Sequence, residues 1–158
     1  MAFLQQAAGS LILRDGKVVG QTLIGQSLID PKYFLGRPSA TAPVAQNASA
    51  SSGSILGPLN PALADAVKGH IEALRAAEPG NAGPMPIELV TTSGSGLDPH
   101  ISVAAAMYQA TRIATRRALP QARVRALIDT HSEGMLLGLI GERRINLLRL
   151  NLALDATV

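Results

Sequence analysis

The sequence contains no cysteine and no tryptophan, and aromatic residues make up only 3% of it. Without cysteine the chain can form neither a disulfide framework nor a thiolate metal site, and it has no cysteine nucleophile. The scarcity of aromatic rings leaves little surface on which nucleic-acid bases could stack. The core must therefore consist of aliphatic side chains, which are plentiful, since hydrophobic residues make up 47% of the 158 positions.

Long apolar runs are also missing. No run reaches the roughly 20 residues that a transmembrane helix needs. The opening MAFLQQAAGS lacks the basic region of a secretory signal. A length of 158 residues without internal repeats fits one domain with a sizeable core. We therefore expect the chain as printed to be a soluble single domain.

The formal net charge is +3, and the basic residues are unevenly distributed. Eight of the fourteen lysines and arginines are arginines after position 100, where only four acidic residues occur. A basic surface can meet nucleic acid, anionic lipid or an acidic partner. Because these arginines are scattered through amphipathic patterns without interleaved aromatics, we expect solvated helix faces and no nucleic-acid binding.

The N-terminal part predicts a β-hairpin followed by loops. Asp15 and Gly16 separate two β-branched runs in GSLILRDGKVVGQTLIGQ, which is typical of a hairpin with a two-residue type I′ turn. The stretch DPKYFLGRPSATA indicates a helical turn and then a constrained loop. Residues 42–60 are small, polar and glycine-rich, and predict a long surface loop.

The rest of the chain predicts mainly helices. Asn60 and Pro61 have the chemistry of an N-cap and a first helical residue, and apolar residues recur at helical spacing up to Leu74. We expect a strand in PIELVTT and a helix over about residues 102–119. A second helix should start at Pro120, with His131 facing inward, and a strand with a final helical turn should close the chain. The order indicates an α+β domain with about three helices and a small, mostly antiparallel sheet.

Two serine-glycine clusters raise the question of a phosphate site. A P-loop needs a lysine beside its glycines, and SGSGLDPH has none, while Asp98 would repel phosphate. Gly94 and Gly96 are better explained as turn residues, with Asp98 or Ser102 capping the next helix. The cluster SASSGSILG also lacks a cation, so both clusters remain ambiguous.

A serine hydrolase or a metal site is the other chemistry to weigh. The sequence contains no Gly-x-Ser-x-Gly motif. A hydrolase would require His100 to reach Ser93 or Ser95. Asp98 and His100 are two possible metal ligands, but no third ligand is near in the sequence. We expect neither enzymatic activity of the isolated chain nor a bound metal.

Several strings together resemble one known family. They are GSLI, LIGQ, YFLGRPSAT, SSGSILGPLNPAL, IELVTTSGSGLDPHIS and INLLRLNLALD, spread from about Gly9 to Asp155. The chain resembles the C subunit of the Kdp potassium-transporting P-type ATPase. This resemblance implies an accessory, non-catalytic subunit beside a channel-like A subunit that selects K⁺, a B subunit that hydrolyses ATP, and a small F subunit. It also implies a catalytic-chaperone role that raises the ATP affinity of the B subunit.

The resemblance carries an expectation about location. The family has an N-terminal transmembrane helix just before the segment that matches QQAAGSLI, where this sequence has only MAFL. We expect residues 1–8 to be the remnant flank of that membrane anchor and residues 9–158 to be the soluble domain. The implied location is the bacterial inner membrane, with the domain on the extracytoplasmic side.

Two candidate sites follow from these considerations. The GRPSAT segment, residues 36–41, combines an arginine, a proline and small residues, which suits docking on the channel-like subunit. Its candidate partner-binding residues are Gly36, Arg37, Pro38, Ser39 and Thr41. The candidate ATP-binding residues, from an analogy with the signature loop of ABC transporters, are Ser51, Ser52, Gly53 and Ser54. The alternative function, a nucleotide-binding regulatory module, needs a cationic pocket near residues 51–57 or 93–98.

Overall fold

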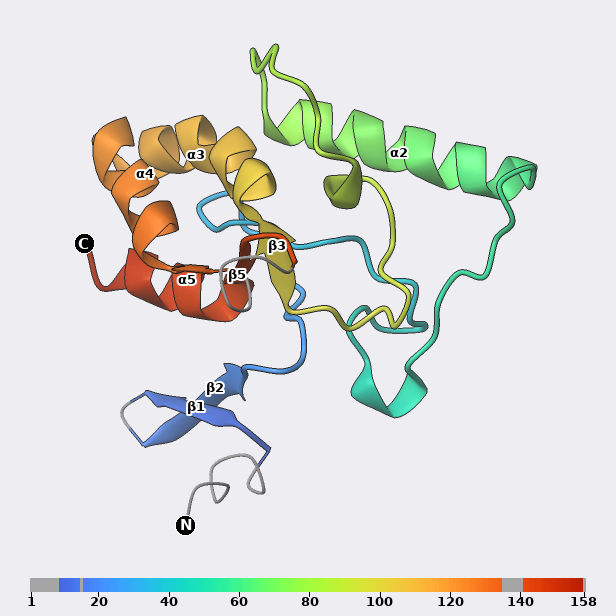
Figure 1. Cartoon of the computed structure of the whole chain (residues 1–158), viewed down its shortest axis with the longest axis horizontal. Helices are drawn as coiled ribbons and strands as arrows, with labels where there is room; N and C mark the ends of the chain where they lie inside the picture. The colour runs from blue at the N-terminus through green and yellow to red at the C-terminus, as the bar shows by residue number, and fades with distance from the viewer. Residues whose placement is uncertain (1–8, 15, 135–140, 158) are drawn as a thin grey trace.

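The structure is a computed structural model that describes residues 9–14, 16–134 and 141–157. It confirms the α+β class: helices and short antiparallel strands alternate with long loops (Figure 1). The elements are β1 (Leu11–Arg14), β2 (Lys17–Gln21), η1 (Ala48–Ala50), α2 (Pro61–Ala77), η2 (Ile87–Leu89), β3 (His100–Ser102), α3 (Val103–Arg117), α4 (Gln121–Thr130), β4 (Ser132–Glu133), β5 (Arg144–Asn146) and α5 (Leu147–Asp155).

The hydrophobic core lies where α3, α4 and α5 surround the small sheet β3-β5-β4 (Figure 1). Ile101 of β3 pairs with Ile145 of β5, and both side chains are fully buried. From α3 the core receives mostly alanines, which allow close approach of the neighbouring elements. Val124 and Ile128 of α4 and Leu150 of α5 complete it. The core is aliphatic, as the composition predicts.

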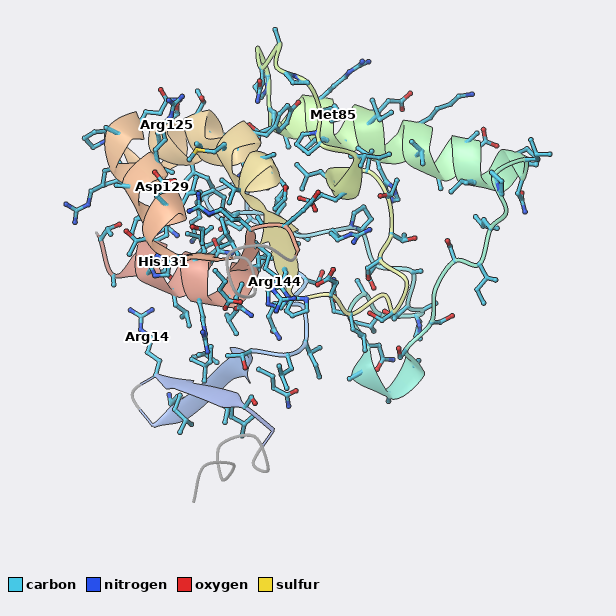
Figure 2. The ribbon with its side chains drawn as sticks, viewed as in Figure 1. Arg14, Met85, Arg125, Asp129, His131 and Arg144 are labelled. Carbon is cyan, nitrogen blue, oxygen red and sulfur yellow. The ribbon has the colours of Figure 1, made fainter. Side chains whose placement is uncertain are left out.

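The start of α3 follows the predicted capping chemistry. The hydroxyl of Ser102 accepts a hydrogen bond from the N–H of Ala105, three residues later. The helix ends at Arg117, and Ala118 takes a left-handed conformation (φ +52°) that closes the last turn before Pro120. At the end of α4, His131 is half-buried, and its Nδ1 lies 2.9 Å from the carbonyl oxygen of Leu127 (Figure 2).

Two of the sequence-based element predictions are wrong. The stretch PIELVTT forms no strand but the 3₁₀ turn η2, because Pro86 starts a turn in which Val90 donates to the carbonyl of Ile87. The C-terminal stretch is mainly α5, nine residues long, preceded by the three-residue strand β5. Here the side chain of Asn146 accepts from the N–H of Arg149 and caps the helix.

The N-terminal hairpin is confirmed. β1 and β2 pair antiparallel with a bulge between Ile12 and Leu13, and Gly16 has the positive φ (+75°) that the turn requires. The other predicted turn residue, Asp15, lies outside the described residues. The hairpin lies below α5, and Arg14 extends from it toward that helix, where Nη1 is 3.7 Å from a carboxylate oxygen of Asp155 (Figure 2).

The helix α2 begins as predicted, with the Asn60 side chain accepting from the N–H of Ala62 and Pro61 in the first turn. Its apolar stripe is only partly covered, because Leu74 is buried whereas Val67 and Ile71 remain half-buried. α2 lies to one side of the α3–α5 core (Figure 1). Among the helices of the described residues, none has the length and apolarity that a membrane crossing requires.

Candidate functional site

The backbone just before the GRPSAT segment is paired with side chains in place of a neighbouring strand. Gln109 of α3 accepts from the N–H of Leu35 (2.8 Å) and donates to its carbonyl (3.0 Å). Asn151 of α5 does the same for Phe34, at 2.9 and 3.1 Å. Both amide side chains are buried. This arrangement satisfies the polar groups of an extended chain that crosses the core surface.

Arg112 of α3, which also donates to the side chain of Gln109 (2.7 Å), holds the turn that precedes this extended chain. Its guanidinium donates to the carbonyls of Pro31 and Tyr33, the latter at 2.9 Å. Its Nε lies 2.6 Å from a carboxylate oxygen of Glu78, and the two side chains are only 4% and 2% exposed. Burial raises the pKa of the Glu78 carboxyl, against the opposing effect of Arg112. The chain that enters the GRPSAT segment is thus fixed to α3 and to the end of α2.

Arg37, the candidate docking arginine, contacts the residues on either side of the serine-glycine cluster at positions 93–96. Its Nη2 donates to the carbonyl of Thr92 (3.1 Å), and its Nη1 lies 3.5 Å from a carboxylate oxygen of Asp98. The hydrogen bond to His100 holds the pKa of Asp98 below its usual value. Arg37 therefore faces an ionised carboxylate, which offsets part of its charge.

The hydroxyls of Ser39 and Thr41 shape the loop around them. Ser39 donates to the carbonyl of Gly96 (2.7 Å) and accepts from the N–H of Gln46 (2.9 Å). Thr41, which is buried, donates to the carbonyl of Val44 (2.8 Å). The loop thus closes on itself and on residues 93–98. The structure brings Arg37, Ser39 and Thr41 together, with their polar groups directed mainly into the protein.

The two remaining candidate docking residues lie at the start of the same loop. Gly36 approaches α5 so closely that a Cβ there would meet Leu147 Cδ2 at 2.9 Å. Pro38 is half-buried. Both residues line a cavity of about 420 Å³ between this loop, residues 26–29 and α2. This cavity was not predicted from the sequence, because its walls come from segments that lie far apart in the chain.

The candidate nucleotide residues 51–54 lie against the serine-glycine cluster at positions 93–96. Ser51 donates to the carbonyl of Ser95 (3.1 Å), and a Cβ at Gly53 would meet the carbonyl oxygen of Gly94 at 2.7 Å. Likewise a Cβ at Gly96 would meet the carbonyl oxygen of Ser52 at 2.7 Å. Both clusters stand out in the sequence, but their packing against each other was not predicted. The small residues common to both were the available signal.

The electrostatics near this pair of clusters do not favour a polyphosphate. Within the described part of the chain, the cation that contacts them is Arg37, through Thr92 and Asp98. The hydroxyl of Ser52 donates to the carbonyl of Gly53 (3.1 Å), and Ser54 accepts from Thr92. These hydroxyls are thus already hydrogen-bonded to neighbouring groups of the chain. An ionised Asp98 nearby would oppose a triphosphate.

The arrangement required for a serine hydrolase is not formed. Nδ1 of His100 lies 3.5 Å from a carboxylate oxygen of Asp98, and the hydroxyl of Ser95 accepts from the N–H of Leu97. Neither Ser93 nor Ser95 is hydrogen-bonded to His100. Among the described residues there is also no cluster of three His, Asp or Glu side chains suited to a metal ion.

Comparison with known proteins places the chain in a family. The model of a family described as "K+-transporting ATPase, c chain" matches residues 1–156. The chain belongs to the KdpC family. A relative from Polaromonas naphthalenivorans is 65% identical over 156 residues, which are 99% of this chain and 80% of the relative. The corresponding protein of Variovorax paradoxus is 63% identical over 155 residues, which are 98% of this chain and 80% of the relative.

Both relatives carry the name "Potassium-transporting ATPase KdpC subunit". The resemblance inferred from the sequence is therefore confirmed. As a KdpC subunit, the chain is a component of the K⁺-transporting ATPase and not a catalytic enzyme by itself. Potassium is the ion that the complex transports.

Proposed function

We propose that this KdpC chain acts by docking on the channel-like subunit of the complex through residues 36–47, which we call the docking loop. The observation that carries the proposal is that the loop is fixed internally and still presents apolar surface. Ser39 and Thr41 hold its backbone, whereas Val44 at its tip remains 62% exposed. A preorganised loop loses little conformational entropy when it binds.

The proposal gives the five candidate docking residues definite roles. Arg37, Ser39 and Thr41 set the shape of the docking loop through their hydrogen bonds. Gly36 and Pro38 lie at its start, where Gly36 contacts α5 and both residues line the cavity. The contact surface itself consists of the loop tip and the cavity rim. In this proposal the domain lies beside the channel-like subunit, on the extracytoplasmic side of the inner membrane that the resemblance implies.

In this proposal the effect on ATP is indirect. The serine-glycine clusters offer hydroxyls that are already bonded and an ionised Asp98 in place of a cationic pocket. Any increase in the ATP affinity of the ATP-hydrolysing subunit would then be transmitted through the assembled complex, which includes the small F subunit. The alternative of direct nucleotide binding at Ser51, Ser52, Gly53 and Ser54 predicts NMR shifts at those residues on titration with Mg-ATP.

The docking proposal is tested by charge placed at the loop tip. Val44→Asp should reduce the amount of this subunit that co-purifies with a tagged channel-like subunit, because an interface would have to desolvate the new carboxylate. Ile55→Asp is the matched control, since Ile55 is 92% exposed but belongs to the candidate nucleotide loop. If both variants co-purify with the tagged channel-like subunit as well as the parent chain does, the proposal is contradicted.

A further inference from the structure

The hairpin β1–β2 projects from the domain and is attached to it near its base (Figure 1). The side chain of Asn146 donates to the carbonyl of Thr22, just after β2, at 2.7 Å. Gly20 approaches α5 so closely that a Cβ there would meet Leu148 Cδ2 at 2.7 Å. Gly20 pairs with Ile12, which is half-buried. The ribbon face that carries Ile12 and Gly20 is therefore the one turned toward α5.

The opposite face of the hairpin is aliphatic and exposed. Leu13 and Val18 form the next cross-strand pair, and they are 63% and 57% exposed. Leu11, two residues before Leu13 and therefore on the same face, is 43% exposed. We call these three residues the outer hairpin face. Single exposed aliphatic side chains are normal, but neighbours that form a contiguous patch are typical of interaction sites.

Basic side chains surround this hairpin. Arg14 and Lys17 are exposed and pair across the strands beside the turn. Even with Asp15 in the turn, the hairpin sequence keeps a net positive charge. On the adjoining elements, two carboxylates are each shared by two arginines. The pairs are Arg14 and Arg117 on Asp155, and Arg144 and Arg149 on Glu133. One carboxylate balances one guanidinium, so this side of the domain carries excess positive charge.

A phospholipid surface matches both properties. Aliphatic side chains enter the boundary between headgroups and acyl chains, whereas lysine and arginine reach the phosphates with their long side chains. A K⁺-transporting ATPase works within a lipid bilayer, so lipid lies beside the complex to which this chain belongs. We propose that the outer hairpin face rests on the anionic lipid surface next to the complex, with Arg14 and Lys17 toward the phosphates.

Other occupants suit this face less well. A second copy of the chain would bring like charges together across a two-fold contact. Three aliphatic side chains are also a small patch beside the roughly 800 Å² per partner of a stable protein interface. The cores of such interfaces are enriched in aromatic residues, and the hairpin sequence from Leu11 to Gln21 contains none.

The contact is tested with a dye on the outer hairpin face. Because the chain has no cysteine, Leu13→Cys gives one labelling site, and bimane is attached before assembly into the complex. The complex is placed in nanodiscs of phosphatidylethanolamine and phosphatidylglycerol with brominated acyl chains, which quench the dye on contact. Fluorescence should fall by roughly half or more, since the face lies at the headgroup boundary. Leu59→Cys, at a 96% exposed position before α2, is the matched control and should not be quenched.

Each outcome of the quenching experiment decides the proposal. Quenching at position 13 without quenching at position 59 supports it. An emission at position 13 that shifts to the blue on assembly but is not quenched would show that a protein surface covers the face, and would overturn it. Unshifted and unquenched emission, or equal quenching at both positions, would also overturn it. The result is independent of the docking proposal, because both variants leave residues 36–47 unchanged.

The two contributions to lipid binding are separated by sedimentation of the chain with vesicles. Leu13→Ser should lower binding to phosphatidylglycerol vesicles about tenfold or more, because an aliphatic contact is lost. Lys17→Gln should lower it about fivefold, as expected for one basic residue near an anionic surface. The matched controls Leu59→Ser and Lys68→Gln, both at exposed positions, should bind like the parent chain. A parent chain that binds phosphatidylglycerol no better than phosphatidylcholine, or controls that lose as much binding as the hairpin variants, would overturn the proposal.

Discussion

The guanidinium of Arg112 and the carboxylate of Glu78 lie 2.6 Å apart, and both side chains are almost completely buried. This pair joins the end of α2 to α3, since Glu78 is the C-cap of α2. Arg112 also binds the carbonyls of Pro31 and Tyr33, which lead into the docking loop. The position of the proposed docking surface thus depends on contacts that lie well inside the domain.

Glu78→Ala should destabilise the domain strongly. The substitution leaves the Arg112 guanidinium buried without its counter-ion, for which a loss of about 3–5 kcal/mol in the free energy of unfolding is typical. The measurement is urea unfolding at neutral pH. Glu133→Ala is the control, because Glu133 pairs with Arg144 at an exposed site, where the loss should stay below about 1 kcal/mol. Equal losses for the two variants would contradict the account.

Gln109→Leu should destabilise the domain through the backbone of Leu35. The variant keeps an apolar side chain of similar size but leaves the N–H and the carbonyl of Leu35 without partners. We expect the free energy of unfolding to fall by about 2–3 kcal/mol. Gln121→Leu, on the exposed surface of α4, should change it by less than about 0.5 kcal/mol. If the two variants unfold at the same urea concentration, the pairing of the Gln109 side chain with the Leu35 backbone contributes nothing to stability.

Gly53→Ala should disturb the contact between the two serine-glycine clusters. Its Cβ would lie 2.7 Å from the carbonyl oxygen of Gly94, and backbone must move to relieve that contact. A loss of about 1–3 kcal/mol is expected from such overpacking. Gly94→Ala is the matched control, because nothing lies within 4 Å of a Cβ there. The measurement is thermal unfolding of the two variants side by side. A loss of stability in Gly94→Ala as large as that in Gly53→Ala would contradict the packing described above.

Asp98 should make part of the stability dependent on acid pH. The hydrogen bond to His100 holds the pKa of Asp98 below 3.8 in the folded chain, so the unfolded chain takes up the proton first as the pH falls. The contribution of Asp98 is therefore present above about pH 4 and is lost as the pH falls further.

Asp98→Asn should remove this part of the acid dependence. The difference in Tm between pH 6 and pH 3 should be smaller in Asp98→Asn than in the parent chain. Asp65→Asn, on the exposed side of α2, should leave that difference unchanged. A parent-like difference in Asp98→Asn would show that another group is responsible.

The sequence predicted those elements whose ends carry their own capping chemistry. Asn60 and Pro61 mark the start of α2, Ser102 marks that of α3, and Gly16 permits the hairpin turn. The prediction failed for residues 86–92, where an apolar run resembles a strand but the backbone after Pro86 closes into η2. It also failed at the C-terminus, where leucines at helical spacing form α5 and the predicted strand is limited to β5.

The candidate sites were predictable as segments but not as a surface. The GRPSAT segment and both serine-glycine clusters stand out in the sequence. Their packing depends on contacts between residues about 40–60 positions apart, such as Ser39 with Gly96 and Ser51 with Ser95. No local pattern encodes them.

The measurement that tests docking most directly is photo-crosslinking in the assembled complex. Ile29, at the open side of the cavity, is replaced by p-benzoylphenylalanine, and Arg125 on the exposed side of α4 (Figure 2) serves as the control position. The account predicts that position 29 crosslinks to the channel-like subunit and that position 125 does not. Crosslinking of position 29 to the ATP-hydrolysing subunit instead, or to no subunit, would contradict it.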